Sequence, residues 1–302
     1  MTNKENPDER IKQELASSKD TRKKQKIGLI QIDGTMPNLA LMKLSSFYKQ
    51  KGFDIIFIDL STLKIKNWIA SKVFVGGSGY NLKGDLPKEI EEITPDYEGF
   101  KLNYSLGFTS RGCFRNCDFC IVQEKEGMIR EANMDWIKHT KAILYDNNFL
   151  ASPKWKEKLQ YFIDNDIKVS INQAMDIKLI NEENAKILLQ LKSYDWKFKK
   201  RTYYFAFDDI KLEPIIKEKI AFLQSLGFNS RWLMFYILCG FNSTHEEDLR
   251  RVEIIKNLGC IPYIMKYNDR TDDKWLNHFD RYVNGLYYQF IPLENYKNGV
   301  LV

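Results

Sequence analysis

The sequence feature that most constrains the fold is a regular alternation of short apolar runs and helical stretches, which begins at Leu106. Helical stretches occupy residues 182–192, 213–226 and 245–258, among others. Such alternation is typical of parallel strands joined by crossover helices, so we expect an α/β fold with an incomplete, six-stranded, TIM-like (β/α) barrel. The six runs that fit buried strands are residues 106–110, 142–145, 168–175, 202–207, 232–238 and 261–267.

Three of the five cysteines follow the first of these runs directly. Cys113, Cys117 and Cys120 have the spacing Cys-x3-Cys-x2-Cys, and thiols this close can converge on one metal centre. One candidate is zinc, with a histidine or a distant cysteine as fourth ligand. The other is an iron–sulfur cube, which normally takes four cysteines and would here keep one iron open. Since the loop follows a barrel strand, we expect it at the carboxyl-end face, where barrel enzymes carry their chemistry.

This motif, with Phe119 just before its last cysteine, resembles the signature of radical S-adenosylmethionine (radical SAM) enzymes. The resemblance implies a 4Fe-4S cluster on Cys113, Cys117 and Cys120, which would be the metal-binding and catalytic residues. The open iron would bind S-adenosylmethionine and cleave it reductively to methionine and a 5′-deoxyadenosyl radical. It also implies an electron donor such as flavodoxin or ferredoxin. The substrate, whether a small molecule, a peptide or RNA, is not identified.

The resemblance further implies contacts to S-adenosylmethionine at the strand ends. Asp146 and Asn148 would accept the amino group, although the two glycines of the family's Gly-Gly-Glu segment are missing. Asn172 and Gln173 would bind ribose hydroxyls or the carboxylate. For either pair, side chains that stabilise a turn are an equal alternative. Gly240 would let the backbone approach the adenine, near residues 265–267. The expected cofactor-binding residues are Phe119, Asp146, Asn148, Asn172, Gln173 and Gly240.

Other polar and sulfur groups have less specific predictions. Asp208 and Asp209 end the fourth strand, where we expect substrate binding or helix capping. Cys260 is expected in the core, and for Cys239 packing is favoured over a role at the active face, because free cysteine is usually buried. An alternative to the enzyme is a non-catalytic iron–sulfur electron-transfer protein, in which Cys239 or a solvent ligand completes the cluster.

The region before the barrel predicts a small doubly wound, Rossmann-like domain, with strands at 26–31, 53–59 and 72–75 and a helix at 37–51. It resembles the cobalamin-binding-like domain that precedes many radical SAM enzymes. Their cobalt-binding histidine lies in an Asp-x-His-x-x-Gly motif, whereas the first histidine here is His139. Cobalamin is therefore not expected, and the domain would be a degenerate scaffold.

The expected organisation has four parts. The first 26 residues hold eight Lys/Arg and five Asp/Glu, which favours a disordered basic tail. A zinc-stabilised module that binds nucleic acid through this tail is a further alternative, although the net charge of +6 is modest. The expected parts are the tail at 1–26, the Rossmann-like domain at 27–100, the partial barrel at 101–275 and a closing helix and strand at 276–302.

Apolar run lengths and cysteine usage bear on location. The longest apolar run, residues 232–241, is half of the roughly 20 residues that a membrane helix needs, and the N-terminus is polar. Clustered cysteines without a disulfide framework suit a reducing compartment. We therefore expect a cytoplasmic protein that does not interact with membranes, of undetermined oligomeric state.

Overall fold

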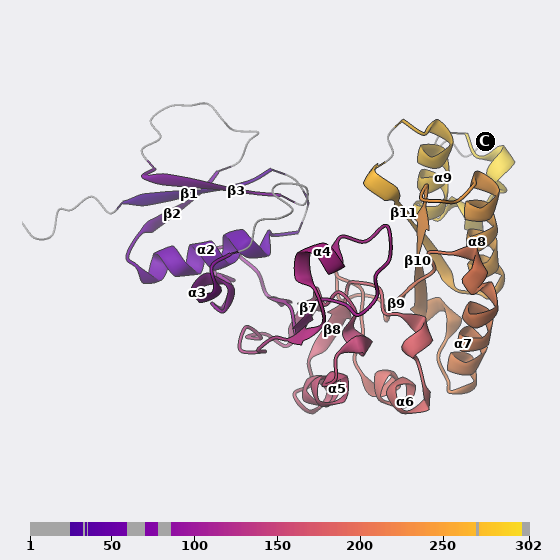
Figure 1. The fold of residues 1–302 in the computed structure, drawn as a ribbon, viewed down its shortest axis with the longest axis horizontal. Helices are drawn as coiled ribbons and strands as arrows, with labels where there is room; N and C mark the ends of the chain where they lie inside the picture. Colours follow the sequence, from indigo (N-terminus) through magenta and orange to yellow (C-terminus); the bar gives the residue numbers. More distant parts are fainter. Residues whose placement is uncertain are drawn as a thin grey trace, which may run out of the picture. The chain divides into compact units, whose positions relative to one another are not determined.

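The structure is a computed structural model that describes residues 25–32, 34, 36–58, 70–77, 86–269 and 272–297. The chain divides into two compact units, residues 1–100 (the N-terminal unit) and 101–302 (the C-terminal unit), shown in Figure 1. Most of the expected tail lies outside the described residues. Among the helices of the described part, none is long and apolar enough to cross a membrane.

The N-terminal unit contains a three-stranded parallel sheet. Strands β1 (Lys26–Gln31), β2 (Asp54–Ile58) and β3 (Lys72–Gly76) are ordered β2-β1-β3. Helix α2 (Leu39–Gln50) begins at the N-cap Asn38, whose side chain accepts a hydrogen bond from the backbone of Leu41. The strands and helix match the sequence expectation. The buried core of this unit comprises Ile27, Leu29, Leu41, Leu44 and Ile90, the last from the short helix α3 (Lys88–Glu91).

The described part of the C-terminal unit holds two three-stranded sheets in which every pairing is parallel. Met175 and Phe205 form an isolated parallel bridge, which connects the segment after β8 to β9. These strands confirm the predicted α/β class, and no sheet within the described residues closes into a barrel. One sheet has the order β4 (Ser105–Gly107), β7 (Lys141–Leu144), β8 (Lys168–Ile171), and the other has β11 (Ile261–Lys266), β10 (Leu233–Cys239), β9 (Tyr203–Ala206).

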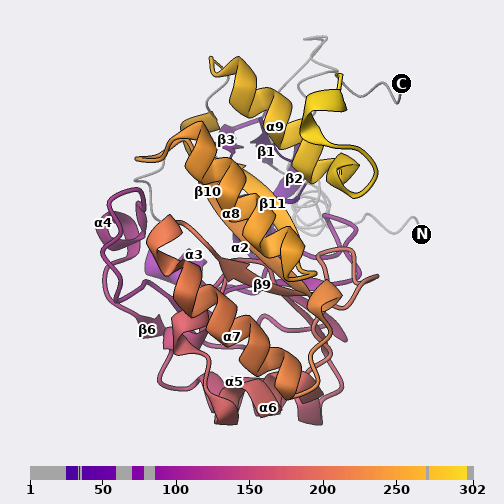
Figure 2. The same cartoon turned by 90° about the vertical axis from the view of Figure 1, so that its right-hand side faces the viewer.

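Helices follow the strands of this unit, as the alternation predicted. Figure 2 shows α7 and α8 lying along one side of the β9–β11 sheet. A capping box begins α8, because the side chains of Thr244 and Glu247 each bond the other's backbone. The helices are α5 (Trp155–Asp164), α6 (Glu182–Gln190), α7 (Glu213–Ser225), α8 (His245–Asn257) and α9 (Lys274–Asn284).

Two details differ from the sequence expectation. The strand expected at 168–175 ends at Ile171, and the chain turns before Met175 pairs again with β9. The expected closing strand is replaced by two 3-10 turns, Tyr287–Gln289 and Leu293–Asn295. Several aromatic side chains there pack on one another, as where Tyr296 meets the rings of Tyr282 and Tyr287 at 5.4 and 4.8 Å, while Phe290 is exposed.

Candidate functional site

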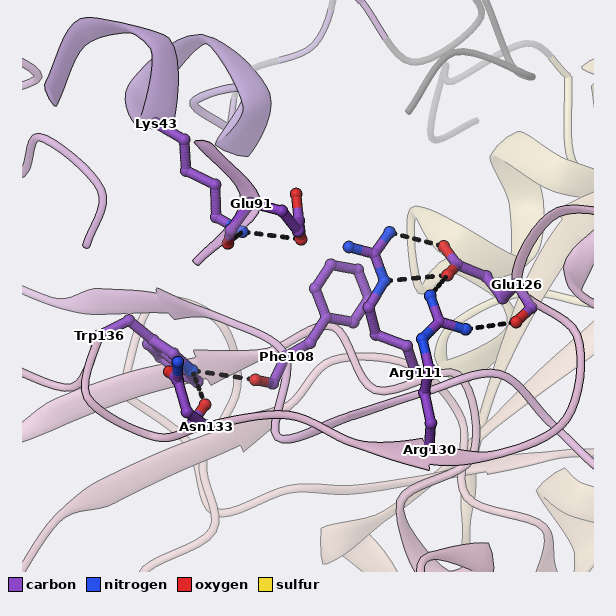
Figure 3. A network of polar contacts seen from close by, with 8 residues as sticks. All are labelled: Lys43, Glu91, Phe108, Arg111, Glu126, Arg130, Asn133 and Trp136. Atoms are coloured by element: carbon purple, nitrogen blue, oxygen red, sulfur yellow. Dashed lines mark hydrogen bonds and ion pairs between the residues drawn. The ribbon is translucent and has the colours of Figure 1, made fainter. Parts of the chain in front are cut away.

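The cysteine loop is closed at its base by a short antiparallel ladder. The strand expected at 106–110 is divided, and its second piece, β5 (Ser110–Arg111), pairs with β6 (Arg130–Glu131). Arg111 donates to both carboxylate oxygens of Glu126 at 2.9 and 2.7 Å, and Arg130 adds a bond of 2.9 Å (Figure 3). The Arg111 guanidinium also lies 4.5 Å from the centre of the Phe108 ring. This ion network fastens the two ends of the loop together.

The same network controls the charge of Glu126. Burial by itself would raise the pKa of this carboxyl, but the hydrogen bonds and charges of Arg111 and Arg130 hold its pKa below the ordinary value. With a side chain only 6% exposed, Glu126 is a buried anion between two cations. The loop base therefore depends on an ionised Glu126.

Gly112 lies at a point where the backbone of the loop folds closely on itself. Its φ is +86°, and a Cβ at this position would come within 2.7 Å of the Gly127 carbonyl oxygen. The N–H of Cys113 donates to that same carbonyl at 3.1 Å. The N–H of Gly112 donates to Oδ1 of Asn147 at 2.8 Å. Glycine is required here, and the loop is anchored to the residues that follow β7.

The three cysteines have different surroundings. Cys113 is buried, and its sulfur accepts hydrogen bonds from the backbone N–H of Arg115 at 3.4 Å and from Nδ2 of Asn148 at 3.7 Å. Cys117 and Cys120 are exposed. Burial raises the pKa of the Cys117 thiol, and the negative charges of Cys120, Asp208 and Cys113 raise it further. Cys120 and Cys113 are thus near enough to Cys117 to affect its thiol electrostatically.

These residues fit an iron–sulfur cluster by the chemistry of their donors. Three thiols come from one loop, and two N–H groups point at one of the sulfurs, as is common where thiolates carry cluster charge. No group of three His, Cys, Asp or Glu side chains in the described residues is arranged to hold a single metal ion. The ligation of a cluster by Cys113, Cys117 and Cys120 stays a prediction.

Asp146 contacts the residues that lead into the cysteine loop. Its side chain is fully buried, and its oxygens accept bonds from the N–H and hydroxyl of Thr109 at 2.7 and 2.6 Å and from the Ser110 hydroxyl at 2.6 Å. Because these partners are the residues just before the cysteine loop, Asp146 supports the loop from β7. These contacts give Asp146 a role in positioning the loop, and its contact with a cofactor stays a prediction.

A cavity of about 500 Å³ lies beside the cysteine loop. The ring of Phe119 meets that of Phe241 at 5.6 Å, and Phe241 meets Tyr267 at 4.8 Å, so aromatic rings from three segments lie together there. Phe119 is thus at the cavity, as expected. The lining residues come from the cysteine loop, the segments after β9 and β10, and helix α8: Asn116, Cys117, Asp118, Phe119, Asp208, Asp209, Ile210, Lys211, Phe241, Asn242, Ser243, Glu247 and Arg251.

Arg251 is a lining residue that sequence reasoning missed. It is 1% exposed, and its guanidinium donates to the carbonyl oxygens of Phe207 at 3.0 Å and Leu238 at 2.7 Å. It also pairs with Asp248, which accepts a further bond from the Ser243 hydroxyl at 2.7 Å. Arg251 therefore joins the ends of β9 and β10 beneath the cavity. Its position on the interior side of α8 is a tertiary property that no local pattern reveals.

The two aspartates after β9 have separate roles. Asp209 accepts from the N–H of Lys211 and caps a 3-10 turn, which is one of the two predicted outcomes. Asp208 lines the cavity, and burial raises its pKa to about 6, although Arg251 and Lys178 counteract the shift. A carboxyl at this place can bind hydroxyl groups or a cation.

The remaining predicted residues lie in or next to strands β8, β10 and β11. Asn172 is half-buried and Gln173 exposed, and neither side chain hydrogen-bonds within the part of the chain that the structure describes. Gly240 has φ +81° and follows β10. Cys239 is fully buried, with its thiol donating to the carbonyl of Ile237, and Cys260 is 4% exposed.

Asn148 is 4% exposed, and its Oδ1 has no hydrogen-bond partner among the described residues.

Comparison of the chain with protein-family models, curated proteins and solved structures found no match.

Proposed function

We propose that this chain is a radical SAM enzyme acting on an unidentified substrate. The observation that carries the proposal is the arrangement of Cys113, Cys117 and Cys120 on one loop after β4, beside a cavity of about 500 Å³. The cluster, once bound, would supply the electron that splits S-adenosylmethionine. The protein would hold the cofactors in position and exclude water.

The arrangement of strands supports the proposal. Six parallel strands in two sheets, connected by the Met175–Phe205 bridge, fit a partial TIM-like barrel. The residues discussed above follow the carboxyl ends of successive strands, which is where barrel enzymes position reactive groups. The loop, Asn148, Asn172, Asp208 and Gly240 follow β4, β7, β8, β9 and β10 in that order.

Several side chains that line the cavity have specific roles in this proposal. Phe119 and Phe241 offer ring faces and edges against which a purine can pack. Asp208 has a carboxylate that can accept hydrogen bonds from ribose hydroxyls. Arg251 keeps the ends of β9 and β10 at a fixed separation, and so positions Asp208 relative to Phe241.

The other expectations belong to the same proposal. The enzyme would receive electrons from a donor such as flavodoxin or ferredoxin and work in the cytoplasm. The N-terminal unit would act without cobalamin, since no histidine precedes His139. The Cys239 thiol is fully buried and bonded to Ile237, so nothing favours it as a fourth cluster ligand.

Anaerobic reconstitution with iron and sulfide tests the proposal at its first step. Wild-type protein should bind about four irons and four sulfides per chain, with brown absorbance that bleaches on reduction. The Cys113→Ala/Cys117→Ala/Cys120→Ala variant should bind neither, while Cys260→Ala, a buried thiol before β11, should load normally. Stoichiometric iron and sulfide in the triple variant would contradict the proposal, and stoichiometric zinc in wild type would favour a zinc module.

A further inference from the structure

We infer that Asn148 is a positioning residue for the cluster: its side-chain amide donates a hydrogen bond to the sulfur of Cys113 and thereby raises the reduction potential of the cluster. The inference rests on the part of the proposed function that puts a cluster on Cys113. It does not depend on the cleavage of S-adenosylmethionine.

The contact comes from a firmly held segment. Asn148 precedes the turn Phe149–Ala151, in which Phe149 is 1% and Leu150 6% exposed. Its own side chain is 4% exposed, and Nδ2 lies 3.7 Å from the Cys113 sulfur. A side chain this buried, next to a packed turn, stays in one place. The fold therefore holds the Asn148 amide group beside the Cys113 sulfur.

Cys113 differs from the other two cysteines in this respect. Its sulfur accepts a bond from the Arg115 N–H as well, whereas no hydrogen bond to the sulfur of Cys117 or Cys120 occurs in the described residues. Every residue except proline supplies a backbone N–H at position 115. Replacing the Asn148 side chain therefore changes the number of hydrogen bonds that the Cys113 sulfur accepts.

The effect on potential follows from charge. A reduced cluster carries one more negative charge than the oxidised one, and an N–H directed at a ligand sulfur stabilises that extra charge. Hydrogen bonds to charged groups are stronger than neutral ones, and a buried location strengthens them further. Removal of the Asn148 donor should therefore favour the oxidised state.

The amide oxygen, Oδ1, bears on which atom of the Asn148 side chain faces the Cys113 sulfur. Oδ1 of Asn148 has no partner among the described residues, so the fold does not itself require Nδ2 to face the sulfur. A thiolate does require it, because the reversed amide would bring a carbonyl oxygen against a negative sulfur. A Cys113 thiolate bound to the proposed cluster would therefore select the orientation in which Nδ2 donates.

Redox titration monitored by electron paramagnetic resonance tests the inference on reconstituted protein. Asn148→Ala removes the donor, and Asn148→Asp also adds a negative charge of similar shape. We expect the midpoint potential to fall from wild type to Asn148→Ala and again to Asn148→Asp. For Asn148→Asp, the ratio of reduced to oxidised cluster at a fixed potential should drop at least tenfold, about 59 mV for a one-electron couple.

The matched control is Asn229→Asp. Asn229 is exposed and accepts a bond from Arg231 as the N-cap of a 3-10 turn, a role that aspartate performs equally well. It adds the same charge to the same unit away from the loop, so its midpoint potential should equal that of wild type. Iron content, measured in parallel, shows whether each variant is fully loaded.

A second measurement detects the contact between Asn148 and the cluster directly. Asparagine labelled with nitrogen-15 at the side-chain amide should give a hyperfine coupling to the reduced cluster in pulsed spectra, and that coupling should be lost in Asn148→Ala. Absence of the coupling in wild type overturns the inference, even if neither variant takes up a cluster. Fully loaded variants with the wild-type potential overturn it as well.

Failure of the proposed function is distinguishable. A wild-type protein that binds no iron refutes both statements. A wild-type cluster with the expected shift in Asn148→Asp, but without cleavage of S-adenosylmethionine, refutes the enzyme proposal and leaves the role of Asn148 in place.

Discussion

The backbone N–H of Gly112 donates to Oδ1 of Asn147 over 2.8 Å, and this bond ties the cysteine loop to the end of β7. The neighbouring Asn148 contacts the Cys113 sulfur, and Asp146 holds Thr109 and Ser110 on the approach to the loop. Three consecutive residues after β7 therefore fix where the first cysteine lies.

Gly112→Ala should disrupt this arrangement. The new Cβ would be 2.7 Å from a backbone carbonyl, and φ of +86° disfavours any side chain. We expect lower iron loading and a loss of about 1–3 kcal/mol in the free energy of unfolding. Iron analysis and urea unfolding measure these.

The control for this substitution is Gly227→Ala, which has a similarly positive φ of +102° but nothing closer than 3.8 Å to the added atom. It should lose a comparable strain energy and retain full iron loading. Normal loading in Gly112→Ala would contradict the tight approach at the loop base.

Glu126→Gln should weaken the loop base in a pH-dependent way. The pKa of Glu126 lies below its ordinary value of 4.5 in the folded protein, so its ionised form stabilises the fold above that pH. As the pH falls through the folded pKa, this stabilisation is lost. Near neutral pH we expect the variant to be about 1–2 kcal/mol less stable than wild type.

Urea unfolding at a series of pH values measures that difference. The gap between wild type and Glu126→Gln should narrow as the pH drops below 4.5. Lys186→Gln, at the exposed Glu182–Lys186 pair, is a control expected to show a gap near zero. A gap for Glu126→Gln that is constant with pH would show that Glu126 acts by shape alone.

Arg251→Lys should weaken the connection between the ends of β9 and β10 beside the cavity. Lysine cannot reproduce the two bonds from one planar guanidinium to the carbonyls of Phe207 and Leu238. We expect a loss of about 2–4 kcal/mol in the free energy of unfolding, because buried acceptors and Asp248 lose their partner. Arg250→Lys, on the exposed side of α8, should change stability by less than about 0.5 kcal/mol. Equal effects at the two positions would contradict the role of Arg251.

The sequence predicted the elements of the fold better than the details of the site. Apolar runs marked β1, β9, β10 and β11 within a residue or two, because buried parallel strands are continuously apolar. The cysteine spacing located the loop because it, too, is a pattern of residues close together in the sequence. The contacts of Asp146 could not be predicted, since an acid after a strand looks the same in sequence whether it faces a ligand or a hydroxyl. Arg251 was missed because its partners are carbonyls distant along the chain.

Asn172→Ala should weaken S-adenosylmethionine binding by about 1–3 kcal/mol if its amide makes a buried hydrogen bond to the ligand. The half-buried side chain is free of other partners in the described residues, so the cluster spectrum should stay intact. Gln173→Ala should weaken binding less, because Gln173 is exposed. Equilibrium binding to reconstituted protein measures both, and unchanged affinity in Asn172→Ala would place that residue outside the binding site.

The most direct test of the central claim is the fate of S-adenosylmethionine. Reduced wild-type protein with a full cluster should convert it to 5′-deoxyadenosine and methionine in equal amounts, slowly even without substrate, as measured by chromatography with mass detection. The variant in which Cys113, Cys117 and Cys120 are alanine should produce neither. A fully loaded, reducible wild-type protein whose 5′-deoxyadenosine does not exceed that of the variant would contradict the enzyme proposal and favour an electron-transfer protein.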